Sequence, residues 1–183
     1  MTFARSSTLA ILLALGLAAC AETRVTDRAA TQATIPAKLA GKTLLVVETA
    51  LPADTPEREA RAAEAVALVR QHLAPVTGGE AAPASDEALA AQARAQGLDS
   101  VSVVRVEDYA RRGNLYVAIA LPPVAWDTRT EVTLRLRVVD ARTGATLTDL
   151  RRDRVRGGLF TLRKAEDLPA ELTETLNSLL PAG

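Results

Sequence analysis

The sequence predicts a single α/β domain of the α+β kind, with a mixed sheet of about five strands and two or three packing helices. In the first half, short β-branched apolar runs alternate with segments of helical period. In the second half, a strictly alternating run precedes a turn signature, which indicates a C-terminal antiparallel hairpin before a terminal helix. The chain has 183 residues, of which 48% are hydrophobic and 24% charged, so it fits one folded domain.

The N-terminus has the features of a bacterial export signal. Arg5 precedes the uncharged apolar run 8–19, which is too short to span a bilayer and is typical of a signal peptide. The run ends in Leu17-Ala18-Ala19-Cys20, where Cys20 is the only cysteine of the chain. This ending resembles the lipobox of bacterial lipoproteins. The resemblance implies cleavage before Cys20, a diacylglyceryl group on its thiol and an acyl chain such as palmitate on its amine.

The predicted organisation therefore has three parts. Residues 1–19 form the lipoprotein signal peptide, 20–42 the lipidated cysteine and a polar tether, and 43–183 a periplasmic α/β domain. The alternatives are an ordinary secretory signal with a free thiol, and an extended arm packed on the domain in place of the tether. By resemblance to Gram-negative sorting rules, Ala21 after the cysteine favours the outer membrane, where the lipid-anchored domain would face the periplasm.

The first half of the domain reads as strand, helix, short strand or loop, helix and strand. Buried strands are expected at 43–49 and 101–106, because both runs are short, apolar and rich in β-branched residues. Pro56 opens a helix that ends near Leu73 and has an apolar stripe at helical spacing. Ser85 caps a second helix that runs to Gln96.

The second half is expected to be mainly antiparallel. Residues 115–121 are strand-like, and 131–138 place apolar and polar side chains on opposite faces. The turn 140–144 ends in Gly144 and connects this strand to a partner at 146–156. Pro169 opens a final helix with a leucine stripe that ends before Pro181.

A family resemblance rests on motifs in a fixed order. Ser85-Asp86-Glu87-Ala88-Leu89 is followed by Gly97-Leu98-Asp99, then by 130–132, 139–144, 160–161 and 166–169. This order resembles the DUF4823 family of bacterial lipoproteins, which has no assigned function, over about 41–180. The alternation of elements is also similar to the TolB N-terminal domain and to CsgG-like lipoproteins, which is a likeness of architecture and does not assign a function.

Candidates for catalysis are few. His72 is the only histidine, and it lies near a predicted helix end, where a surface role is the ordinary interpretation. Glu107 and Asp108 follow a strand and could form an acidic site, but Arg111 and Arg112 come soon after and favour local neutralisation. Trp126, in a loop near two prolines, is a binding anchor or a core cover. The sequence predicts no enzyme, no cofactor and no metal site.

The charges of the chain are unevenly distributed. Although 22 basic residues balance 22 acidic ones overall, residues 129–164 hold ten basic and four acidic residues, a net charge of +6. This pattern predicts one basic hairpin face, and the favoured interpretation is a solvated face whose charges discourage edge pairing. The competing hypothesis is a face that contacts anionic lipid, an anionic envelope polymer or an acidic envelope protein. The candidate interaction residues are Arg135, Arg137, Arg152, Arg154 and Arg156.

The expected function is that of a membrane-anchored envelope lipoprotein with a binding or assembly role. Its partners would be the membrane, reached through the lipid on Cys20, and an envelope protein or anionic polymer. The balanced net charge argues against nucleic acid as a partner. Two alternatives remain open, an accessory factor of a secretion or surface-assembly system and an enzyme that uses Glu107, Asp108 and His72.

Overall fold

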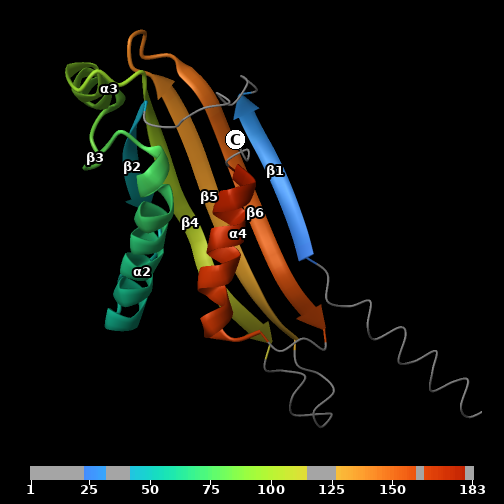
Figure 1. Ribbon diagram of the computed structural model, residues 1–183. Coiled ribbons are helices and arrows are strands. Elements are labelled where there is room, and N and C mark those ends of the chain that lie inside the picture. Colours follow the sequence, from blue (N-terminus) through green and yellow to red (C-terminus); the bar gives the residue numbers. More distant parts are fainter. Residues whose placement is uncertain (1–22, 32–41, 115–126, 160–162, 180–183) are drawn as a thin grey trace, which may run out of the picture.

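The computed structural model describes residues 23–31, 42–114, 127–159 and 163–179. They form a six-stranded sheet with the strand order β1-β6-β5-β4-β2-β3. Helices α2 and α4 lie side by side on one face of this sheet, and α3 lies near one end (Figure 1). The predicted class, a single α+β domain with a mixed sheet and three helices, is confirmed.

The first half of the domain is a parallel unit. Strand β2 (Thr43–Thr49) pairs in parallel with both β3 (Gly79–Ala81) and β4 (Ser100–Asn114). Helix α2 (Pro56–Leu73) connects β2 to β3, and its N-cap Thr55 accepts a hydrogen bond at Oγ1 from the Arg58 amide, with an N–O distance of 3.3 Å. Pro56 occupies the first turn, where no backbone donor is needed, so the helix begins where the sequence predicts.

Helix α3 (Asp86–Ala95) is short and lies across the opposite face of the sheet from α2. Ser85 caps it by accepting a hydrogen bond from the Ala88 amide, with an N–O distance of 3.3 Å. The helix stops at Gly97, whose φ of 70° is a left-handed conformation that favours glycine. The chain then enters β4 directly.

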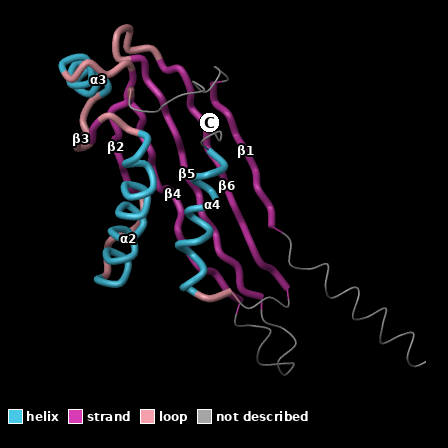
Figure 2. Tube along the Cα trace, in the orientation of Figure 1, coloured by secondary structure: helices cyan, strands magenta, loops and turns pink. Residues whose placement is uncertain are grey.

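Strands β4, β5 (Asp127–Asp140), β6 (Thr146–Leu159) and β1 (Thr23–Thr31) form an antiparallel sheet (Figure 2). The turn between β5 and β6 is held by Asp140, whose Oδ1 accepts hydrogen bonds from the amides of Arg142 and Thr143 at 2.9 and 2.7 Å. Gly144 takes a φ of 73° in this turn. The predicted hairpin is confirmed. Strand β5 extends beyond the expected 131–138 at both ends, and β6 begins at Thr146 as expected but continues past 156.

Two apolar cores lie on the two faces of the sheet. The larger joins α2 and α4 to inward-facing residues of β2, β4 and β5, including Leu45, Leu134 and Leu172. The smaller packs α3 on the other face of β2 and β4, around Leu44 and Leu89. Helix α4 (Leu168–Leu179) buries Leu168, Leu172 and Leu176 of the predicted leucine stripe, together with Leu179. The fourth predicted leucine, Leu180, lies outside the described residues. Every strand position of β2 is thus covered on both sides except at its C-terminal end.

The arm after the predicted anchor differs from a free tether. Residues 23–31 form the edge strand β1, which pairs antiparallel with β6 from Thr23 opposite Arg156. The alternative of an arm packed on the domain therefore describes this part of the chain. The run is polar and has no sustained apolar–polar alternation, so its sequence lacks the pattern that identifies a strand. Residues 1–20 with Cys20, the predicted strand 115–121 and Trp126 lie outside the described residues.

Candidate functional site

Helices α2 and α4 cover only one face of the antiparallel sheet. Alternation along β4, β5 and β6 points about every second side chain to the other face, which we call the open face, with irregularities between Val106 and Asp108 and between Val138 and Val139. In the described part of the chain, the only helix on this side is α3, which packs near the start of β4. The open face is defined by the charged side chains Arg105, Glu107, Glu131, Arg135, Arg137, Asp149, Arg151 and Asp153.

Most charges of the open face are joined in cross-strand ion pairs. Arg135 on β5 donates from Nε and Nη2 to the two carboxylate oxygens of Asp149 on β6, at 2.7 and 2.6 Å. This hydrogen-bonded pair holds the pKa of Asp149 below its ordinary value. Arg137 makes a similar two-point contact with Asp86 of α3, at 2.7 and 2.8 Å. The pairs fix the orientation of the arginines and tie α3 to the sheet.

The three candidate catalytic residues are not gathered into a site. Glu107 faces Arg151 at 3.3 Å on the open face, and Asp108 accepts a hydrogen bond of 2.6 Å from Arg112. His72 lies in the last turn of α2, whereas Asp108 lines a pocket with Arg58 near the first turn. At about 1.5 Å per residue along the helix, His72 and Arg58 are separated by roughly 20 Å. The two acidic residues instead neutralise arginines.

A hollow of about 290 Å³ lies on the open face between β2, β4, β5 and β6. It is lined by Glu48, Val103, Arg105, Arg135, Arg137, Thr146 and Asp149. Arg105 sits opposite Glu48 on one side and Arg135 on the other, and it is exposed. Among the described residues, the Arg105 guanidinium has no hydrogen-bond or ion-pair partner. This hollow therefore offers a cation to an acidic or polar partner.

The candidate interaction arginines occupy two different faces of the sheet. Arg135 and Arg137 point to the open face. Arg152, Arg154 and Arg156 point towards α4 instead, since they lie opposite Leu134, Val132 and Thr130 of β5 in that order. Arg154 and Arg156 contact Glu171 and Glu174 of that helix, and Arg152 donates to the Ser178 carbonyl oxygen. The expectation of one basic face is thus wrong in its geometry, because β6 turns alternate arginines inward. Whether any of the five binds a partner stays a prediction.

Sequence reasoning missed Arg105. The residue is an arginine inside the apolar run 101–106, and period-two alternation assigns it to the face opposite Val104 and Val106. That signal was sufficient to single it out. The acidic pair Glu107 and Asp108, which follows the run directly, is the stronger signal of a site in the sequence.

The described residues hold neither a metal-type cluster nor a membrane-spanning helix. No group of three histidine, cysteine, aspartate or glutamate side chains is arranged to hold a metal ion there. No helix in the same part of the chain has the length and apolar character needed to cross a membrane.

Comparison with known proteins gives structural neighbours. No family model matches the chain, and no curated protein matches its sequence. A structure described as a dodecamer of a PelC point variant from Paraburkholderia phytofirmans is similar over 88% of this chain and all of that chain, with 21% identity and a TM-score of 0.51. Lipoprotein GNA1162 from Neisseria meningitidis aligns at 17% identity over 76% of this chain and 99% of that chain, with a TM-score of 0.36. A minor lipoprotein from Acinetobacter baumannii aligns at 17% identity over 76% of this chain and 87% of that chain, with a TM-score of 0.33. The chain has a fold like that of PelC.

Proposed function

We propose that this protein is a lipid-anchored component of the bacterial cell envelope that acts by binding and assembly. The observation that carries the binding role is the open face, an extended charged surface beside a hollow that holds the exposed Arg105. Its acidic candidates Glu107 and Asp108 are each engaged by an arginine and lie far from His72, so this geometry favours binding over catalysis.

The anchoring part of the proposal rests on the sequence around Cys20. A short apolar run followed by Leu17-Ala18-Ala19-Cys20 favours acylation of the cysteine, and Ala21 favours the outer membrane. Several acyl chains on one residue bind a bilayer stably, since each buried CH₂ group contributes about 0.8 kcal/mol. The domain would then face the periplasm. The motif order that resembles the DUF4823 family is consistent with this proposal.

Cys20→Ala tests the anchor. The wild-type chain should fractionate with outer membranes and incorporate labelled palmitate, whereas the variant should appear in the soluble periplasmic fraction without label. A matched control is Ser6→Ala, which changes the signal region without removing the thiol. A Cys20→Ala protein that fractionates with membranes like the control would refute lipid anchoring.

A second candidate function, a subunit of a secretion or surface-assembly system, is favoured by one comparison. The neighbour with a TM-score above 0.5 is described as a dodecamer, so this fold is able to build large homo-oligomers. Each copy of the present chain has an edge strand at both ends of its described sheet, β1 and β3, where a second copy can dock. Native mass spectrometry of the full-length protein in detergent should show a multiple of the chain mass. A monomer at micromolar concentration would count against this candidate.

A further inference from the structure

A second basic pocket lies away from the open-face hollow, at the far end of β4. Strand β2 ends at Thr49, opposite Val106, and the last backbone hydrogen bond on this side joins the Ala50 amide to the Val106 carbonyl at 2.9 Å. Strand β4 continues to Asn114, and in the described residues no strand pairs with this side of it beyond Val106. The start of α2 runs beside this free edge and encloses a pocket of about 260 Å³.

The charged lining of this pocket is mainly arginine. Four arginines, Arg58 and Arg61 from α2 and Arg111 and Arg112 from β4, line it together with the single acidic residue Asp108. Arg58 is bound by Asp54 at 2.8 and 2.7 Å, and Arg112 by Asp108 at 2.6 Å. These two cations are neutralised, so the uncompensated charge of the pocket comes from the other two.

Arg61 and Arg111 supply that charge. Arg61 is exposed, and among the described residues its guanidinium has no hydrogen-bond or ion-pair partner. Arg111 donates only from Nε, to the Arg163 carbonyl at 2.6 Å, which leaves its two terminal nitrogens facing no described acceptor. The two guanidinium groups come from different elements, so they can approach one anion from two sides.

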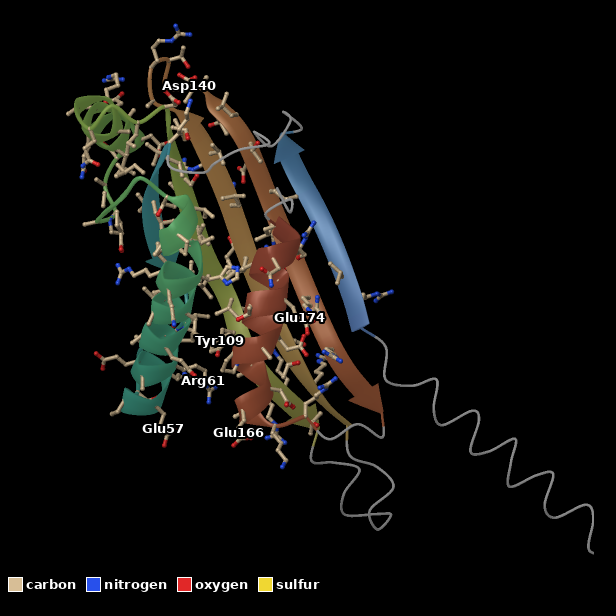
Figure 3. The ribbon with its side chains drawn as sticks, viewed as in Figure 1. Glu57, Arg61, Tyr109, Asp140, Glu166 and Glu174 are labelled. Carbon is tan, nitrogen blue, oxygen red and sulfur yellow. The ribbon has the colours of Figure 1, made fainter. Side chains whose placement is uncertain are left out.

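Tyr109 adds an independent indication of a ligand. Its side chain is 2% exposed and lines the same pocket, yet its hydroxyl is buried without a hydrogen-bond partner in the described residues. Figure 3 shows Tyr109 and Arg61 close together beside α2. A buried hydroxyl without a partner is destabilising, and such groups in native proteins call for an explanation such as a bound ion. A small movement of the ring or of the start of α2 would uncover this hydroxyl, and an anionic oxygen in the pocket would then accept its hydrogen bond.

We propose that this pocket binds a phosphate group, held by Arg61 and Arg111 and by the hydroxyl of Tyr109. Phosphate carries up to two charges and several acceptor oxygens in divergent directions, which matches two guanidinium groups and one hydroxyl from three directions. The phosphate belongs either to a small soluble ligand or to the headgroup of an anionic phospholipid. This inference uses a different surface from the open face and does not depend on the function proposed above.

Equilibrium dialysis of the full-length protein in detergent with radiolabelled inorganic phosphate tests the site. Saturable binding is expected, with the dissociation constant raised on the order of tenfold by Arg61→Gln or Tyr109→Phe. Arg70→Gln is the matched control, because Arg70 is exposed on the same helix and pairs with Glu80 outside the pocket. The proposal is overturned if binding does not saturate, or if Arg61→Gln and Arg70→Gln bind phosphate equally.

A competition arm separates the two sources of phosphate. Vesicles of phosphatidylglycerol are added to the Cys20→Ala protein, which lacks the proposed anchor, and flotation is measured with and without free phosphate. Flotation that phosphate reverses and Arg61→Gln removes assigns the pocket to a lipid headgroup. Phosphate binding that these vesicles leave unchanged assigns it to a soluble ligand.

Discussion

Arg154 on β6 donates from Nε to Oε2 of Glu171 on α4 at 2.9 Å, and both side chains are withdrawn from solvent, at 13% and 3% exposure. Arg156 reaches the other carboxylate oxygen at 3.1 Å. Glu171 is therefore a buried acid clamped between two arginines of one strand. The contact joins the terminal helix to the hairpin through two of the arginines that the sequence suggested as candidate interaction residues.

Removing the acid from this clamp should destabilise the domain strongly. Glu171→Ala removes the buried acid and leaves the largely buried Arg154 guanidinium with only the exposed Glu174, and breaking a buried pair in this way typically costs about 3 kcal/mol of unfolding free energy. Urea denaturation followed by circular dichroism measures the change. Glu174→Ala is the control, since that side chain is 49% exposed and its loss should cost less than about 1 kcal/mol. Equal effects of the two substitutions would contradict the clamp.

The pair of Arg135 and Asp149 predicts a pH-dependent contribution to stability. Its hydrogen bonds lower the pKa of Asp149 in the folded state, so the stabilisation is present above the unfolded value of about 3.9 and is lost as pH falls through the folded value. Arg135→Gln should reduce the unfolding free energy by about 1 kcal/mol at pH 7. The difference in unfolding free energy between the wild type and Arg135→Gln should shrink as the solution is made acidic. A difference that stays constant down to pH 3 would show that this pair is not its source.

Tyr109→Phe should leave the ligand-free protein at least as stable as wild type. Burial raises the pKa of the Tyr109 hydroxyl above its ordinary value of 10.0. The unfolded chain then ionises first, so the stability of the wild type should fall as pH rises above about 10, while the variant lacks this loss. Denaturation curves at pH 7 and pH 11 check both points. If the wild type and Tyr109→Phe lose the same stability between pH 7 and pH 11, the hydroxyl is hydrated in the folded state.

Gly157 should be the least replaceable of the described glycines in the hairpin. Its φ is 115°, and a Cβ atom there would stand 2.5 Å from the Thr128 carbonyl oxygen and 3.0 Å from Cα of Arg129. Gly157→Ala should therefore cost more than about 2 kcal/mol, through backbone strain and a main-chain clash. Gly144→Ala is the comparison, because a Cβ in that turn meets no atom within 4 Å. Equal decreases of the thermal unfolding midpoint for Gly157→Ala and Gly144→Ala would contradict this prediction.

The regular elements of this fold were predictable because each carries its own local signal. Pro56 and the cap at Thr55 fix the start of α2, and Gly97 and Gly144 stand where left-handed backbone is required. Strand β1 was not predictable, since it lies at a sheet edge and its sequence has no sustained apolar–polar alternation. Strand β4 extends to Asn114 because β5 pairs with it along its whole length, which is a tertiary cause.

The site was less predictable than the fold. A basic hairpin is visible in the sequence, but the inward turn of Arg152, Arg154 and Arg156 depends on α4 presenting Glu171 and Glu174 to them. Their pairing joins residues that are at least 15 positions apart. Likewise, the pocket at Tyr109 exists because β2 is shorter than β4, and no local pattern contains that difference.

In-cell photocrosslinking tests most directly whether the protein acts by binding through its open face. A photoreactive amino acid replaces Arg105, which faces the hollow, or Gln71, which is exposed on the opposite side on α2. The account predicts a discrete crosslinked species from position 105, either with a second copy of the chain or with another envelope component, and none of comparable yield from position 71. Equal crosslinking at the two positions, or none at position 105, would contradict a binding role for the open face.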